Sequence, residues 1–238
     1  MSQTARNPVY CALDTTDVGQ ALAWARAIKP YVGGLKVGLE FFNANGPQGV
    51  AKIVEVGLPV FADLKLHDIP NTVAGGIRAV LPLGISIVNV HAAGGEAMLR
   101  AAADAAATAG AKRPRVIGVT MLTSLDQSDL AATGVSGTPT EHVTRLAKLA
   151  KTAGLDGVVC SAHEIAPLRQ ALGPDFMLIV PGIRPAGAAV GDQKRVMTPR
   201  EATKLGATIL VIGRPITAAA DPAAAARAIH DDLFPAAA

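Results

Sequence analysis

Two carboxylates and one amine lie within six residues of each other, where an apolar segment of the chain ends. Residues 60–62 have strand character, and Asp63, Lys65 and Asp68 follow them. Residues i and i+2 of a strand point to the same face, so Asp63 and Lys65 should share one face, with Asp68 on the loop beyond. Buried charges are costly unless they pair or take part in chemistry. We therefore take this trio as the first candidate for an active site.

A second lysine strengthens this interpretation. A structural ion pair is the simplest alternative for an isolated Asp-x-Lys, but Lys36 lies inside another predicted strand and needs a buried partner. Asp63 is a suitable partner. The sequence thus predicts an alternating array of Lys36, Asp63, Lys65 and Asp68, in which each charge favours the ionised state of its neighbours.

The predicted elements that position these residues form a repeating pattern, in which short apolar runs alternate with Ala-rich helical segments. Strands are predicted at 9–14, 34–40, 59–65, 86–91, 115–122, 157–161, 177–182 and 208–213. Helices are predicted at 17–27, 47–56, 72–81, 95–109, 141–153, 164–172, 199–205 and 222–233. Continuous apolar strands are typical of a parallel sheet covered on both faces. We expect an α/β fold in which residues 1–238 form one (β/α)8 TIM barrel, with an open doubly wound sheet as the alternative.

In such a barrel the carboxyl ends of all the strands meet at one rim, which hosts catalysis. Polar residues are found at most of these predicted ends, namely Asp14, Lys36, Asp63, Lys65, Asn89, His91, Thr120, Thr123, Ser161, Arg184 and Arg214. The rim is therefore where we expect the site. His67 is expected at the surface or an interface, and the polar segment 126–138 is expected to be a loop of unassigned role.

The last two predicted β–α units suggest a phosphate site. Gly213 permits close backbone approach, and Arg214 can bind phosphate oxygens with two parallel hydrogen bonds. Barrels often hold phosphate in the loops after strands seven and eight. The long, small-residue segment 184–196 is typical of a loop that closes over a ligand, and Arg184 and Gln193 are its expected anion donors. A merely solvated loop is the alternative.

Composition argues against several other classes of protein. The net charge is +3 with no Lys/Arg block, so we expect no nucleic-acid or polybasic membrane partner. The N-terminus has no apolar signal region, and no uncharged apolar run of about 18 residues occurs, so we expect neither a signal peptide nor a membrane span. Cys11 and Cys160 are expected to be reduced core thiols of a cytoplasmic protein. No Cys/His spacing indicates a metal site.

The segment Asp63-x-Lys65-x-x-Asp68-Ile69-Pro70-Asn71-Thr72 resembles the signature of the orotidine 5'-phosphate decarboxylase family. Further similar segments follow in the family's order at 13–14, 36–38, 90–92, 122–124, 181–185, 191–193 and 211–215. The Asp-x-Lys-x-x-Asp core alone is shared by a wider barrel suprafamily. The Ile-Pro-Asn-Thr extension and the Arg, Gln and Gly-Arg phosphate residues make the resemblance specific, and it is closest to the form common in bacteria.

This resemblance implies a reaction and a set of roles. Orotidine 5'-monophosphate (OMP) would lose carbon dioxide to give uridine 5'-monophosphate (UMP), the last step of de novo pyrimidine synthesis, without metal or organic cofactor. Lys65 would donate a proton to pyrimidine C6, and Asp63, Asp68 and Lys36 would complete the catalytic charge network. The implied substrate-binding residues are Asp14, Lys36, Asp63, Ile69, Thr72, Thr123, Pro181, Arg184, Gln193, Gly213 and Arg214.

Within that set, the resemblance places Asp14, Lys36 and Thr72 at the ribose and Thr123 at the pyrimidine. It places Arg184, Gln193, Gly213 and Arg214 at the phosphate. It also implies a homodimer in which Asp68 and Thr72 reach the partner's site.

Two other functions stay open from the sequence. A metal-dependent sugar-phosphate lyase of the same suprafamily would share the Asp-x-Lys-x-x-Asp core but would need carboxylates to bind Mg²⁺. Lys36 stands at the rim where a cation would compete with that metal. A non-catalytic barrel that binds a phosphate ligand is the second alternative, although it has no evident need for a buried array of alternating charges.

Overall fold

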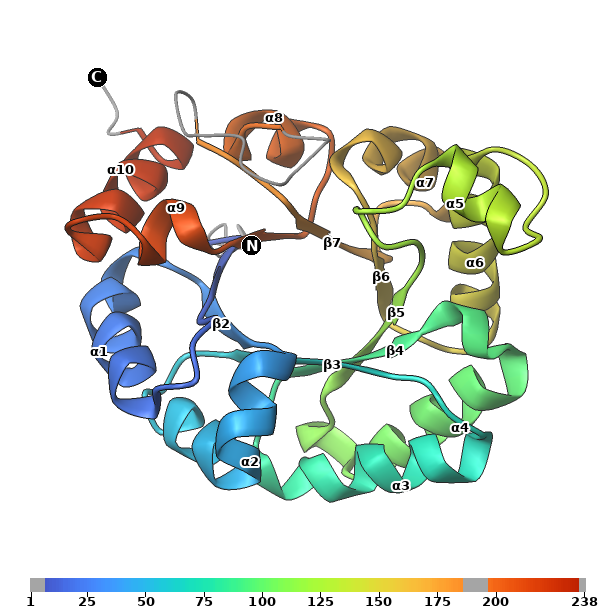
Figure 1. Ribbon diagram of the computed structural model, residues 1–238, viewed down its shortest axis with the longest axis horizontal. Helices are drawn as coiled ribbons and strands as arrows, with labels where there is room; N and C mark the ends of the chain where they lie inside the picture. Colours follow the sequence, from blue (N-terminus) through green and yellow to red (C-terminus); the bar gives the residue numbers. More distant parts are fainter. Residues whose placement is uncertain (1–6, 186–196, 236–238) are drawn as a thin grey trace.

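The computed structural model describes residues 7–185 and 197–235, and these form a closed barrel of parallel strands in the order β1 to β8 (Figure 1). The strands are β1 (Val9–Ala12), β2 (Gly34–Val37), β3 (Val60–Leu66), β4 (Ile87–His91), β5 (Arg115–Val119), β6 (Gly157–Val159), β7 (Met177–Pro181) and β8 (Ile209–Ile212). Pairing of β1 with both β2 and β8 closes the ring. The predicted TIM barrel is confirmed, and the open doubly wound alternative is wrong.

Helices surround the ring of strands (Figure 1). They are α1 (Val18–Ile28), α2 (Leu39–Val54), α3 (Pro70–Val80), α4 (Glu96–Ala107), α5 (Gln127–Ala132), α6 (Pro139–Thr152), α7 (Ile165–Leu172), α8 (Pro199–Lys204), α9 (Arg214–Thr217) and α10 (Pro222–Leu233). Within residues 7–185 and 197–235, five 3-10 turns accompany them, at Lys29–Tyr31, Leu81–Leu83, Ala92–Gly94, Gly110–Lys112 and Ala162–Glu164. None of the helices in the described ranges is long and apolar enough to cross a membrane.

Three helices differ clearly from the sequence prediction: α2 begins earlier, and α5 and the four-residue α9 are not predicted. Helix α2 begins at Leu39 rather than at 47, and Gly46, at φ 60°, introduces a kink just before Pro47. Proline is favoured in a first helical turn, which is why the pattern alone places the start there. The predicted loop 126–138 contains helix α5, which Asp126 caps by accepting hydrogen bonds from the backbone N–H groups of Ser128 and Asp129.

Alternation along the strands divides the core into two layers. One set of alternate residues faces outward and packs against the helices, and both cysteines belong to this set as buried free thiols. The other members fill the barrel interior with apolar side chains, namely Tyr10, Ala12, Phe61, Ile87, Ile117, Ile179, Ile209 and Val211.

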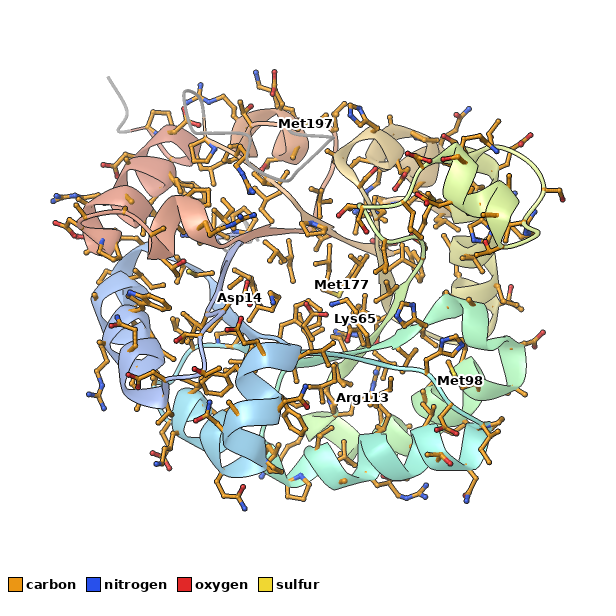
Figure 2. The ribbon with its side chains drawn as sticks, in the orientation of Figure 1. Asp14, Lys65, Met98, Arg113, Met177 and Met197 are labelled. Carbon is orange, nitrogen blue, oxygen red and sulfur yellow. The ribbon has the colours of Figure 1, made fainter. Side chains whose placement is uncertain are left out.

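This alternation positions the site. Two residues beyond Ala12, Phe61 and Val211 come Asp14, Asp63 and Gly213, so the next inward layer toward the carboxyl end is polar. Figure 2 shows Asp14 and Lys65 inside the ring of strands, whereas Met98 of α4 lies outside it. The apolar layer thus forms the floor of a polar mouth.

Candidate active site

A cavity opens at this mouth, and apolar side chains of the barrel interior form its floor. Most of the predicted site residues line it, namely Asp14, Lys36, Asp63, Lys65, Thr123, Pro181, Arg184, Gly213 and Arg214. The lining carries both lysines, both carboxylates and two arginines, so the cavity suits an anionic ligand with a polar body.

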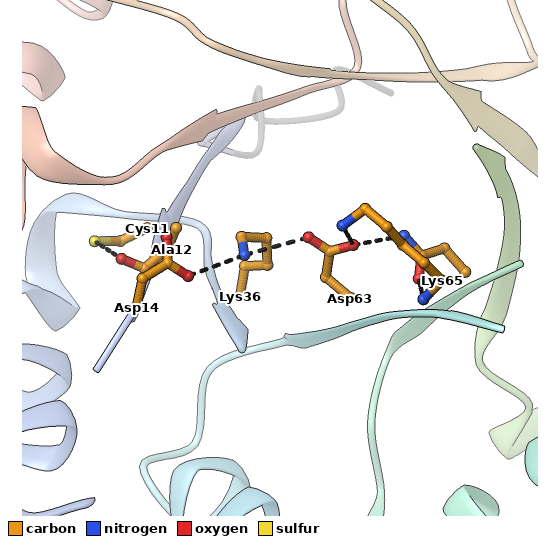
Figure 3. A network of polar contacts seen from close by, with 7 residues as sticks. Cys11, Ala12, Asp14, Lys36, Asp63 and Lys65 are labelled. Atoms are coloured by element: carbon orange, nitrogen blue, oxygen red, sulfur yellow. Dashed lines mark hydrogen bonds and ion pairs between the residues drawn. The ribbon is translucent and has the colours of Figure 1, made fainter. Parts of the chain in front are cut away.

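The charged side chains of the first three strands form one continuous row (Figure 3). Lys36 Nζ lies 3.3 Å from Asp14 Oδ1 and 3.2 Å from Asp63 Oδ2, and Lys65 Nζ lies 2.6 Å from Asp63 Oδ1. The side chains of Lys36 and Asp63 are 10% and 13% exposed, whereas that of Lys65 is 30% exposed. Lys65 is therefore the ammonium of the row that reaches furthest into the open cavity.

The row keeps its buried members charged. Burial alone would lower the pKa of Lys36, but Asp63 and Asp14 raise that pKa above its ordinary value. Burial alone would raise the pKa of Asp63, but Lys36 and Lys65, together with a hydrogen bond from Asn89, hold it below its ordinary value. The site thus presents fixed charges of alternating sign at neutral pH.

Strand β3 is irregular where it carries the site. Ala62 pairs with Val88 and Leu66 pairs with Val90, so the three residues of β3 between Ala62 and Leu66 face one residue of β4, which is Asn89. Such a bulge leaves ladder groups unpaired and redirects side chains. Lys65 has a φ of 51°, and among the described residues it is the one non-glycine residue with positive φ.

Asn89 is a site residue to which the sequence analysis gave no role. Its side chain is fully buried; the amide nitrogen donates to Asp63 Oδ1 at 2.7 Å and the amide oxygen accepts from the Lys65 backbone N–H at 2.7 Å. The available signal was an amide inside the otherwise apolar run 87–90.

Two arginines face the array from the last two strands. Arg184 follows β7 and is 9% exposed, and its backbone N–H donates to Met197 O. Arg214 opens α9 directly after Gly213. An ideal Cβ on Gly213 would lie 3.8 Å from Asp14 Oδ2. The turn after β8 therefore lies next to Asp14, the first residue of the charged row. The predicted Gln193 lies outside the described residues.

Comparison with known proteins identifies the family. The model of the orotidine 5'-phosphate decarboxylase / HUMPS family matches residues 7–229. The chain belongs to this family. The sequence-based assignment to the decarboxylase family is thereby confirmed.

Individual relatives agree with that assignment. The chain is 54% identical over 238 residues to an orotidine 5'-phosphate decarboxylase of Rhodospirillum rubrum, covering 98% of this chain and 96% of the relative. It is 54% identical to a protein of the same name from Moorella thermoacetica, covering 96% and 93%. The crystal structure of orotidine 5'-phosphate decarboxylase from Lactobacillus acidophilus superposes with a TM-score of 0.85 at 38% identity, covering 96% of this chain and 99% of that one.

Three residues of the decarboxylase signature lie away from this cavity. Asp68, Ile69 and Thr72 are exposed where β3 leads into α3, and Asp68 Oδ1 accepts from the Ile69 backbone N–H at 2.7 Å. Within one chain the fourth member of the charged row is therefore Asp14, at its other end, rather than Asp68. The reason is that the chain leaves the barrel after Leu66, so Asp68 points away from its own cavity.

The histidines near the signature form a pair beside the site. His67 is exposed, as expected, and its ring lies 5.3 Å from that of His91 between centroids. Burial, together with His67 and Lys65, lowers the pKa of His91. In the part of the chain that the structure describes, no three His, Cys, Asp or Glu side chains gather closely enough to hold a metal ion.

Proposed function

We propose that this chain decarboxylates orotidine 5'-monophosphate to uridine 5'-monophosphate, the last step of de novo pyrimidine synthesis. The observation that carries the proposal is the Lys65 ammonium, held 2.6 Å from Asp63 at the open end of a buried row of alternating charges. Membership of the family and relatives of that name at 54% identity support the choice of substrate.

The proposed chemistry uses Lys65 twice. When the bond between C6 and the carboxyl carbon breaks, carbon dioxide leaves and the electron pair stays on C6, in the plane of the ring, where no π system delocalises it. A fixed ammonium at that position stabilises the developing carbanion electrostatically. Lys65 then transfers a proton from Nζ to C6 and regains one from solvent. Asp63 and Lys36 keep that ammonium charged and in place.

The order of the strands around the ring supports the binding mode. Arg214 and Gly213 follow β8, Asp14 follows β1, Lys36 is on β2 and Lys65 is on β3. Around the ring these neighbouring strands therefore present first an anion-binding arginine, then a carboxylate with an amine, and last the reacting ammonium. A nucleotide has its phosphate, ribose and base in the same order, so we assign phosphate to Arg184 and Arg214, ribose hydroxyls to Asp14 and Lys36, and the pyrimidine to the Lys65 end near Thr123.

The competing function is the metal-dependent sugar-phosphate lyase that the Asp-x-Lys-x-x-Asp core leaves open, and the matching family model also carries the name HUMPS. In this chain Lys36 Nζ lies between Asp14 and Asp63, at 3.3 and 3.2 Å. The two carboxylates that could bind Mg²⁺ are therefore already paired with an ammonium, which argues for chemistry without metal.

The decisive assay follows the ultraviolet absorbance of OMP mixed with the purified protein, with and without EDTA. We expect loss of the orotate signal at the same rate in both. Turnover that EDTA abolishes would instead support a metal-dependent lyase. Binding of UMP by a folded protein without any turnover would support a non-catalytic binder.

We also propose that the chain acts as a homodimer in which Asp68, Ile69 and Thr72 complete the partner's site. Their exposure on one chain supports this. Ile69 is 66% exposed just after β3, and Leu39, just after the neighbouring strand β2, is 49% exposed. Large apolar side chains exposed together indicate an interaction surface.

A cytoplasmic location fits the two buried free thiols.

Mixing two inactive variants tests the shared site. In a mixed dimer of Lys65→Ala and Asp68→Ala subunits, one site combines both defects and the other contains neither. Random mixing should then restore up to about a quarter of wild-type activity, because half of the dimers are mixed and each has one intact site. If Asp68 serves its own subunit, mixing restores nothing. Sedimentation at assay concentration gives the oligomeric state independently.

A further inference from the structure

The β3 bulge creates a conformational problem at the proposed reacting residue. A non-glycine residue in the left-handed region is strained, and this conformation persists only where its surroundings over-determine it. Lys65 is in that region at φ 51°, and the bulge takes its backbone N–H out of the regular pairing with β4. Something other than the strand ladder must therefore hold Lys65.

Asn89 supplies the hydrogen-bond acceptor that the strand ladder does not offer to the Lys65 backbone N–H. Its side-chain oxygen accepts from the Lys65 backbone N–H at 2.7 Å, and its side-chain nitrogen donates to Asp63 Oδ1 at 2.7 Å. That same oxygen of Asp63 accepts from Lys65 Nζ at 2.6 Å. Asn89, Asp63 and Lys65 thus close a ring of three hydrogen bonds that fixes both ends of Lys65.

The orientation of this amide follows from its partners. Turned the other way, it would set its NH2 group against the Lys65 N–H and its oxygen against a carboxylate oxygen. A fully buried amide with both functions satisfied is rigid, and it is the one β4 residue opposite the bulge.

We infer that Asn89 is a positioning residue for the reaction. It acts through Lys65 and Asp63, which it sets in register, rather than on the substrate. The inference rests on the proposed decarboxylation, since it assigns Asn89 to placing the ammonium against C6. Misplacement of a reacting group by about 1 Å can cost on the order of 100-fold in rate.

The first test replaces Asn89 with leucine, which has the same branched heavy-atom skeleton and makes neither hydrogen bond. We expect kcat for OMP to fall about 100-fold while KM and the affinity for UMP change less than about threefold, because the phosphate and ribose residues are untouched. Thr120→Val is the matched control. Thr120 is 5% exposed just after β5, donates one partly buried hydrogen bond to Val159 O at 2.8 Å, and is not among the residues that line the cavity.

The second variant, Asn89→Asp, keeps the test decisive if the leucine variant does not fold. As a carboxylate it still accepts from the Lys65 N–H but repels Asp63, whereas its protonated form can also donate to Asp63 as the native amide does. We expect its kcat, relative to that of the wild type, to rise at least tenfold as the pH falls from 8 to 5.

The outcomes separate the inference from the function. If Asn89→Leu keeps wild-type kcat, or Asn89→Asp follows the wild-type pH profile, Asn89 is not a positioning residue. The same holds if Thr120→Val loses as much kcat as Asn89→Leu, since the effect is then general to buried hydrogen bonds of the barrel. If the wild-type protein itself does not decarboxylate OMP, the proposed function fails first.

Discussion

Replacing Asp63 with asparagine removes the one carboxylate that holds two ammonium groups. Asp63 faces Lys65 Nζ at 2.6 Å and Lys36 Nζ at 3.2 Å. In an effective dielectric constant of about 20, each contact corresponds to a gross attraction of about 5–6 kcal/mol. Desolvation of the charges offsets much of this, and removing one partner of a buried pair costs about 3–5 kcal/mol net.

The lower end of that range applies here. The asparagine retains an acceptor for one lysine, and Lys36 keeps Asp14 at 3.3 Å. We therefore expect the free energy of unfolding at pH 7 to fall by about 3 kcal/mol, with a Tm lower by about 6–12 °C for a chain of this size. Urea denaturation at one fixed protein concentration measures the change, and Asp104→Asn, at an exposed position on α4, is the matched control.

The pH dependence of the difference tests its cause. Asp63 has a lowered pKa in the folded protein, so its carboxylate contributes stability above the unfolded pKa and loses it as the pH falls through the folded value. The gap between wild type and Asp63→Asn should be constant from about pH 8 to 5 and should narrow only below about pH 4. An Asp63→Asn protein as stable as wild type at pH 7 would refute the view that this carboxylate offsets two buried charges.

Three further predictions concern the two ends of the barrel. Lys65→Ala should abolish turnover and leave UMP binding measurable by calorimetry; near-normal turnover would exclude Lys65 as the proton donor. Arg214→Ala should chiefly raise KM for OMP in steady-state assays, and a fall confined to kcat would contradict a ground-state phosphate grip. Asp156 accepts from the two terminal guanidinium nitrogens of Arg113 at 2.7 and 2.8 Å near the start of β6, so Asp156→Ala should cost about 2 kcal/mol in urea unfolding with kcat unchanged. A lower kcat there would show that this end is coupled to the site.

Much of this fold could be predicted because its signals are local. Each of the eight predicted strands overlaps an observed one, since strands buried on both faces are continuous apolar runs. The predictions failed where short-range chemistry competes with periodicity. Helix α5 has six residues in a polar segment and depends on its Asp126 cap, and the start of α2 precedes a kink at Gly46 that the Pro47 signal obscures.

The candidate site could be predicted as a set of residues that gather in one cavity, but not as a geometry. The alternation of side chains along each strand places Asp14, Lys36 and Asp63 on the inner face. In the structure Lys36 Nζ lies 3.3 Å from Asp14 and 3.2 Å from Asp63. The partnership of Asn89 with Lys65 depends on how β3 and β4 are registered, which no single strand encodes. The proposed role of Asp68 requires a second chain, which the sequence of one chain cannot position.

The alternation of side chains along β3 and the bulge that interrupts it contribute differently to the placement of Lys65. The rule that residues i and i+2 share a face correctly brings Asp63 and Lys65 into one cavity, but a regular strand would leave the lysine backbone paired to β4 and its ammonium free to sample rotamers. The bulge exchanges that ladder pairing for the ring of bonds through Asn89, which holds the backbone and the ammonium to one carboxylate. Departures from ideal local structure are expected where function requires them. Preorganisation at Lys65 therefore comes from the irregular pairing of β3 with β4, and the regular barrel supplies the rigid floor beneath it.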